Sequence, residues 1–182
     1  MSLNFKNNYK TYLEFIEDGA PKLQPYLLES IKDAMLQFEN SKHADLDKYL
    51  YGPLQDYANN PGKMHRPLTC LAAYLATANA NEENIEPVIS IACAIENFQS
   101  AALIHDDIAD SGSLRRGKPC MHITHGEGIA INAGDFGLSM TIGLLIDKLK
   151  EYGYSETKIL KIARWLTFME YMTIEGQALD LG

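Results

Sequence analysis

The segment "LIHDDIADSGSLRRGKP", residues 103–119, concentrates residue types that can bind metal ions and phosphate groups. Asp106 and Asp110 are four residues apart, so on a helix both carboxylates lie on one face and can converge on one ion. Oxygen ligands in a partly hydrated site suit Mg²⁺, which accepts one or two carboxylates together with water and substrate phosphates. Asp107 points about 100° away and either supports the other two aspartates or is solvated. Taken alone, such a cluster is more often an exposed acidic helix end, so the neighbouring residues must distinguish this from a metal site.

Two consecutive arginines, Arg115 and Arg116, follow the aspartates. Guanidinium groups are the usual bidentate partners of phosphate oxygens, although they could instead neutralise the aspartates. An ion pair within a helix would place the arginines three or four residues from the acids, whereas these two lie on the adjacent loop. The spacing therefore favours a phosphate ligand.

Two further segments carry weaker signals. "PGKMHRP" contains the basic pair Lys63 and Arg66 before an alanine-rich helix, which is also compatible with an ordinary helix start. "EGQALDLG" places Gln177 and Asp180 three residues apart on one helix face, next to a glycine that permits close approach of a ligand. Each segment alone is weak evidence.

The residues before the aspartates extend their face along the same helix. Steps of three or four residues connect Gln99, Ala102, Asp106 and Asp110, so an amide and a methyl group lie beneath the two acids on one face. Such a row is unusual on a buried helix. Two basic sites, one acidic site and a long apolar helix together indicate a diphosphate ester with a hydrophobic tail as the ligand.

The elements that must position these residues are helices. Apolar residues recur at helical spacing and β-type alternation is absent, which predicts an all-α helical bundle forming a single domain over residues 1–182. Residues 111–119 are expected to form a loop. The expected helices cover residues 9–18, ended by "GAP", then 25–40, 54–58, 67–78, a central buried helix from Asn84 or Ile85 to about 110, 128–153 and 155–181.

Composition excludes several classes of protein. The net charge of -8 opposes a nucleic-acid partner, which requires a basic surface. The longest apolar run is interrupted by Glu96, Asn97 and Gln99, so no transmembrane segment is expected. Three widely spaced cysteines without a CxxC pair indicate reduced thiols and a cytoplasmic protein. His122 and His125 lack a third metal ligand and are not expected to bind metal.

Four segments, "PGKMHRP", "LIHDDIADSGSLRRGKP", "AINAGD" and "EGQALD", occur in this order. With these separations the chain resembles the trans-isoprenyl diphosphate synthases, also called polyprenyl synthetases, from roughly residue 20 onward. The resemblance implies an isoprenoid-synthase-like bundle around a central cavity, a homodimer, and condensation of an allylic diphosphate with isopentenyl diphosphate. It also implies magnesium as the cofactor, because the departing diphosphate must be stabilised in a site closed to water.

The resemblance assigns roles by motif position. Asp106 and Asp110 would hold Mg²⁺ on the allylic diphosphate, and Arg115 would contact the same diphosphate. Gln177 and Asp180 would close this site from a facing helix. Isopentenyl diphosphate would be bound by Lys63, Arg66, Gln99 and Arg116.

The chain departs from the family pattern in two respects. The first motif commonly reads Gly-Gly-Lys-Arg-x-Arg-Pro, and here Pro61 and Met64 replace its first Gly and first Arg, so no role is assigned to Met64. The family's second Asp-rich motif does not occur before Gly182, so the sequence corresponds to an N-terminal portion of the family domain.

Small residues before the aspartates bear on product length. Bulky aromatic residues five and four positions before the first aspartate limit product length in the resembling family, and here these positions are Ala101 and Ala102. The growing tail can then pass one turn deeper, to Phe98, which predicts products of about twenty carbons or more. Two alternatives stay open: a class I terpene cyclase, which does not need the second basic site, and a non-catalytic diphosphate-binding or regulatory subunit.

Overall fold

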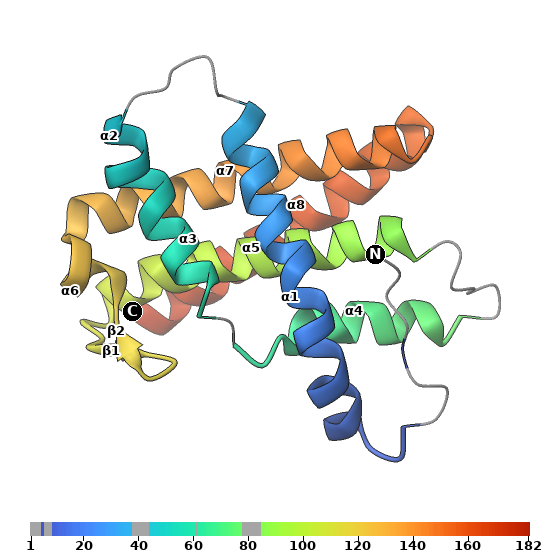
Figure 1. Ribbon diagram of the computed structural model, residues 1–182, viewed down its shortest axis with the longest axis horizontal. Coiled ribbons are helices and arrows are strands. Elements are labelled where there is room, and N and C mark those ends of the chain that lie inside the picture. The colour runs from blue at the N-terminus through green and yellow to red at the C-terminus, as the bar shows by residue number, and fades with distance from the viewer. Residues whose placement is uncertain (1–4, 6–8, 38–43, 61, 78–84) are drawn as a thin grey trace.

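A computed structural model describes residues 5, 9–37, 44–60, 62–77 and 85–182 of the chain, and its helical architecture confirms the all-α prediction (Figure 1). Two very short strands, β1 (Leu114–Arg115) and β2 (Lys118–Pro119), form an antiparallel hairpin. The helices are α1 (Tyr12–Gln37), α2 (Ala44–Leu46), the π-helical turn η1 (Asp47–Tyr51), α3 (Gly52–Ala58), α4 (His65–Leu75), α5 (Glu86–Ala109), α6 (Met121–His125), α7 (Glu127–Glu151) and α8 (Glu156–Leu181).

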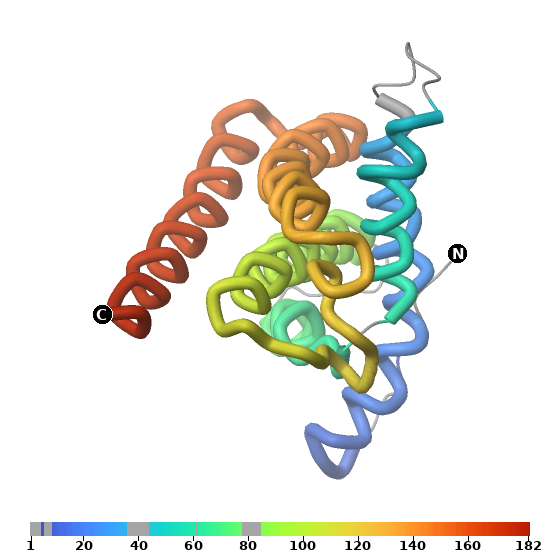
Figure 2. The backbone as a smooth tube through the Cα atoms, turned by 90° about the vertical axis from the view of Figure 1, so that its left-hand side faces the viewer, coloured from blue at the N-terminus to red at the C-terminus, as the bar shows by residue number. Residues whose placement is uncertain are grey.

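Helix α5 lies at the centre of the bundle. In Figure 2, α1 and α3 lie on one side, α5 and α7 in the middle, and α8 on the other side. The α5 and α7 helices approach closely because α7 carries glycine at the contact: a Cβ on Gly137 would lie 2.9 Å from the Cβ of Ala101. The central layer is therefore tightly packed, and the candidate site residues of α5 face outward from it toward α4, the hairpin and α8.

Helix α1 is longer than the sequence pattern predicted. The prediction of separate helices over 9–18 and 25–40 is wrong within the described residues, since one helix continues through "GAP" and contains Pro21 and Pro25. Its buried face continues across the predicted break, from Ile16 to Leu23. Gly19 packs against α4, where an added Cβ would lie 2.6 Å from Leu68 Cδ2. Packing of this face outweighs the cost of the prolines.

The hairpin replaces the loop expected over residues 111–119. Arg116 and Gly117 both have positive φ, 54° and 78°, as a two-residue turn of type I′ requires. Arg115 pairs with Lys118 across this turn. An Arg-Gly pair lacks the Asn-Gly or Asp-Gly signature that usually marks such a turn in a sequence.

Other helix boundaries differ modestly from expectation. Helix α4 begins at His65 and ends at Leu75, α7 ends at Glu151, and the short helix α6 was not expected. The N-cap of α5 is Ile85, while Asn84, the other expected start, lies outside the described residues together with positions 38–40 and 78.

Helices α5 and α7 are each long and apolar enough to cross a membrane by length and composition. This is weak evidence for a membrane span, since a core helix of a soluble protein meets the same criteria and most of the apolar window of α5 is buried within the bundle. The three cysteines, Cys70, Cys93 and Cys120, are free thiols as expected.

Candidate functional site

A cleft between α5 and α8 brings most of the predicted site residues together. Its volume is about 510 Å³, and Leu138 of α7, Ile174 and Leu181 of α8 provide apolar walls. The predicted residues that line it are Arg66, Phe98, Gln99, Ala102, Asp106 and Gln177. A polar group of α4, α5 and α8 side chains therefore borders a largely apolar space.

Asp106 joins three elements at this cleft. The amide of Gln177 donates a hydrogen bond to Asp106 Oδ1 at 3.0 Å, which ties α8 to α5. The other carboxylate oxygen lies 3.3 Å from Nη2 of Arg115 on the hairpin. Asp110 is the exposed C-cap of α5, one turn beyond Asp106, and its amide donates to the Asp106 carbonyl at 2.9 Å. Asp180, also exposed, lies near the end of α8.

Asp107 anchors the hairpin rather than facing solvent. It is 2% exposed, and it accepts hydrogen bonds from Nε of Arg115, at 2.8 Å, and from Nη2 of the same side chain. The hydrogen bond with Asp107 raises the pKa of the Arg115 guanidinium above its usual value. The Asp107 carbonyl also accepts the amide of Gly112 at 2.9 Å. Asp107 is therefore not solvated, and the partner that it supports is Arg115 rather than the other two aspartates.

Arg116 is held by a second acid on the same helix. Its Nη2 lies 3.5 Å from Oε1 of Glu96, Nη1 donates to the Asn60 carbonyl at 2.8 Å, and the guanidinium lies over the Tyr57 ring, 5.5 Å from its centroid. The argument that their position on a loop speaks against ion pairs is therefore wrong, because both arginines pair with acids. The hairpin folds back along α5, so acids distant in sequence reach arginines that no spacing within one helix would pair.

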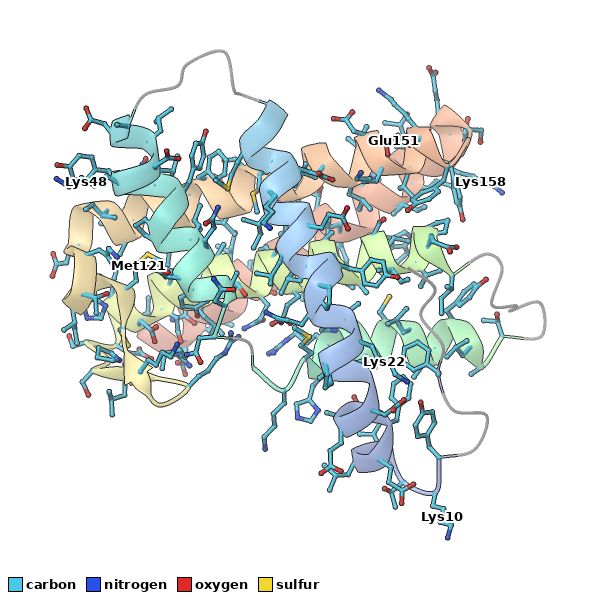
Figure 3. All side chains as sticks on the ribbon, viewed as in Figure 1. Lys10, Lys22, Lys48, Met121, Glu151 and Lys158 are labelled. Carbon is cyan, nitrogen blue, oxygen red and sulfur yellow. The ribbon has the colours of Figure 1, made fainter. Side chains whose placement is uncertain are left out.

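Glu96 is a site residue that sequence analysis missed. It is 4% exposed, and burial raises the pKa of its carboxyl, while Arg116 and Arg66 act in the opposite direction. The available signal was a glutamate inside the most apolar helix, where an unpaired charge would be costly. By contrast, the labelled Lys10 and Lys158 lie at the rim of the molecule (Figure 3).

The first basic motif converges on Arg116. Gly62 lies against its guanidinium, where an added Cβ would be 2.9 Å from Nε. Lys63 is exposed, Met64 is buried with a left-handed φ of 51°, and Arg66 follows on the first turn of α4. The structure thus brings Arg66 and Arg116, which the sequence placed in two separate segments, near enough to the buried Glu96 to act on its carboxyl.

Of the residues predicted to control product length, only two line the cleft. Phe98 and Ala102 border it, whereas Ala101 is 2% exposed and packs against Gly137 of α7. The placement of Ala101 beneath Asp106 is therefore wrong. Ala101 faces α7 rather than the cleft, while Ala102, the next residue along α5, lines the cleft.

The remaining polar groups do not form a protein-only metal site. Among the residues that the structure describes, no three His, Cys, Asp or Glu side chains group to hold a metal ion. His105 lies 3.3 Å from Asp135 Oδ1 and 3.2 Å from the Ile131 carbonyl, so it links α5 to α7. The candidate ligands Asp106 and Asp110 are oxygen donors only, which fits an ion completed by diphosphate and water oxygens.

An all-α bundle whose central helix carries carboxylates to the edge of an apolar cleft has the fold of the isoprenoid synthases. Residues 47–182 match the polyprenyl synthetase family. The chain belongs to this family.

Three relatives illustrate the match. The short chain isoprenyl diphosphate synthase of Methanocaldococcus jannaschii is 31% identical over 143 residues, covering 79% of this chain and 41% of that protein. Geranylgeranyl pyrophosphate synthase 10, mitochondrial, of Arabidopsis thaliana is 31% identical over 181 residues, covering 97% and 44%. The crystal structure of geranylgeranyl pyrophosphate synthetase from Pyrococcus horikoshii superposes with a TM-score of 0.74 at 26% identity, covering 93% and 46%. The chain thus spans less than half the length of these relatives.

Proposed function

We propose that this chain carries the first Asp-rich motif and the basic residues of a trans-prenyltransferase site. The reaction is condensation of an allylic diphosphate with isopentenyl diphosphate to a trans-polyprenyl diphosphate of about twenty carbons or more, one helical turn of added depth corresponding to roughly one isoprene unit. The cleft between α5 and α8 is the observation that carries this proposal, because Asp106 and Gln177 meet at its polar part and Phe98 lies within its apolar part.

The allylic diphosphate is assigned to the Asp106 side of the cleft. Asp106 and Asp110 supply the carboxylates for Mg²⁺, which when bound neutralises the charge that develops on the departing diphosphate. Arg115 adds a fixed guanidinium whose direction Asp107 sets. Gln177 orients Asp106, and Asp180 lies one turn further along α8.

Isopentenyl diphosphate is assigned to the basic cluster of Lys63, Arg66 and Arg116, with Gln99 beside it in the cleft. Arg66 and Gln99 both line the cleft, so a diphosphate there would leave its hydrocarbon directed toward the allylic tail. A class I terpene cyclase does not need this second cluster of cations, which favours chain elongation over cyclisation.

A homodimer is part of the proposal. Trp165 and Phe168 are 71% and 51% exposed on α8 and pack edge to face, with Tyr171 and Met172 on the following turn also exposed. Apolar surface of this kind is typical of interfaces. Sedimentation equilibrium tests the assembly: a monomer at every concentration, or a dimer that survives Trp165→Glu with Phe168→Glu, would contradict it.

A radiolabel assay tests the function. The chain is incubated with Mg²⁺, farnesyl diphosphate and labelled isopentenyl diphosphate, and the product alcohols are separated by chromatography. Label in alcohols longer than the fifteen-carbon farnesyl chain is expected. The second candidate is a non-catalytic diphosphate-binding subunit, for which the paired cations Arg66 and Arg116 beside Glu96 would suffice without turnover. Calorimetric binding of isopentenyl diphosphate without turnover would favour the subunit, and absence of binding would contradict both.

A further inference from the structure

Glu96 is a buried carboxylate beside two arginines of the basic cluster, Arg66 and Arg116. It projects from α5, its side chain is 6% exposed, and its Oε1 lies 3.5 Å from Nη2 of Arg116. Arg66, on α4, also acts electrostatically on this carboxyl. A glutamate is almost never fully buried without a charged partner, so its position is explained by the two arginines.

The guanidinium of Arg116 is constrained on several sides. Glu96 contacts Nη2, the Asn60 carbonyl accepts from Nη1 at 2.8 Å, and the Tyr57 ring and Gly62 lie against it. A planar, forked donor held in this manner has one orientation. Lysine could not reproduce this geometry, because an ammonium group cannot reach both acceptors from one planar fork.

Two guanidinium groups repel each other, and a carboxylate that attracts both offsets this repulsion. We propose that Glu96 is a positioning residue that holds Arg116 and Arg66 together, ready for the diphosphate of isopentenyl diphosphate. This role rests on the proposed function, since it assumes that these arginines bind that ligand. Glu96 itself does not touch the substrate and acts through the arginines.

Isothermal titration of the 182-residue chain with isopentenyl diphosphate tests this role. Glu96→Gln keeps the size of the side chain and removes its charge, and we expect the dissociation constant to rise about tenfold or more. Glu170→Gln is the matched control, because burial also raises the pKa of Glu170, while this residue lies on α8 and does not line the cleft. The affinity of the Glu170→Gln variant for isopentenyl diphosphate should equal that of the wild type.

A double-mutant cycle separates positioning from a purely structural effect. If Glu96 acts through Arg116, Glu96→Gln should weaken binding much less in an Arg116→Gln background than in the wild type. Equal effects in both backgrounds, or unchanged or tighter binding by Glu96→Gln alone, would overturn the proposal. Circular dichroism confirms that each variant is folded. Should Glu96→Gln not fold, Arg116→Lys replaces it as the test, with the same loss expected and full affinity contradicting the role.

The Nε–Hε resonance of Arg116 in ¹⁵N-arginine-labelled protein provides a readout that needs no substrate. Glu96→Gln should shift or broaden this resonance, and Glu170→Gln should leave it unchanged. If the wild-type chain binds no isopentenyl diphosphate, the proposed function fails, and the resonance still decides whether Glu96 positions Arg116. A resonance unchanged by Glu96→Gln would overturn the positioning role whatever the binding result.

Discussion

Replacement of Asp107 by asparagine should destabilise the protein although it preserves the size of the side chain. The Asp107 carboxylate is 3% exposed and accepts two hydrogen bonds from Arg115. Hydrogen bonds to charged groups contribute about 1.5–3 kcal/mol, and removal of one partner of a buried ion pair costs about 3–5 kcal/mol. Arg115 is 31% exposed and keeps Asp106 at 3.3 Å, which lowers this cost. We therefore expect a loss of about 2–3 kcal/mol in the free energy of unfolding.

Urea denaturation followed by circular dichroism measures this loss, and thermal unfolding should show a decrease in Tm of roughly 5–10 °C. Asp110→Asn is the matched control, since it removes an exposed carboxylate at the C-terminus of α5. The control should be neutral or slightly stabilising, because a negative charge at a helix C-terminus is unfavourable. Equal stability of the two variants would refute the assignment of Asp107 as the anchor of Arg115. In combination with Arg115→Gln, the effects of Asp107→Asn should be clearly non-additive.

Three further predictions concern the cleft, a buried acid and the metal ligands. Ala102→Phe should fill the cleft and shorten the product seen by chromatography. Ala101→Phe should instead lower Tm by overpacking against Gly137, at a cost of about 1–3 kcal/mol. Equal product lengths for Ala102→Phe and the wild type would show that the product's hydrocarbon tail does not run through this cleft. Burial raises the pKa of Glu170 above 4.5, so between these two pKa values the folded state binds more protons than the unfolded state. The free energy of unfolding should therefore fall as pH rises from 4.5 through the folded-state pKa. Urea titrations should show a smaller pH dependence for Glu170→Gln, and an unchanged pH dependence would refute this contribution of Glu170. Asp106→Ala should abolish the Mg²⁺ dependence of allylic diphosphate binding measured by calorimetry, and a retained dependence would exclude Asp106 as a ligand.

Local spacing predicted the part of the site that lies along single helices. Gln99, Ala102 and Asp106 follow one face of α5, as their separations of three and four residues require, and all three line the cleft. The contact of Gln177 with Asp106 needed more than spacing, because it joins residues 71 positions apart. The family resemblance supplied that pairing, and periodicity alone would not have done so.

The errors arose where tertiary contacts outweigh local signals. The "GAP" segment has strong helix-breaking composition, yet α1 continues through it because Gly19 fits against Leu68. The turn at Arg116 and Gly117 lacks the usual hairpin residues, and its strands contain two residues each, too few for any alternation to be visible. Helical spacing was also the wrong criterion for the arginines, because their acidic partners reach them across the hairpin.

The geometry of α5 explains how the separate acidic and basic segments of the sequence meet in the folded chain. Glu96 and Asp107 are eleven residues apart, so about 1,100° of helical rotation brings them within roughly 20° of the same face, about three turns apart. The consecutive arginines lie on the hairpin along this face, and each pairs with one acid: Arg115 with Asp107 and Arg116 with Glu96. A single rigid helix thereby fixes the distance between two guanidinium groups assigned to two different diphosphates. The ion pairs with Asp107 and Glu96 hold both guanidinium groups in place before any ligand binds.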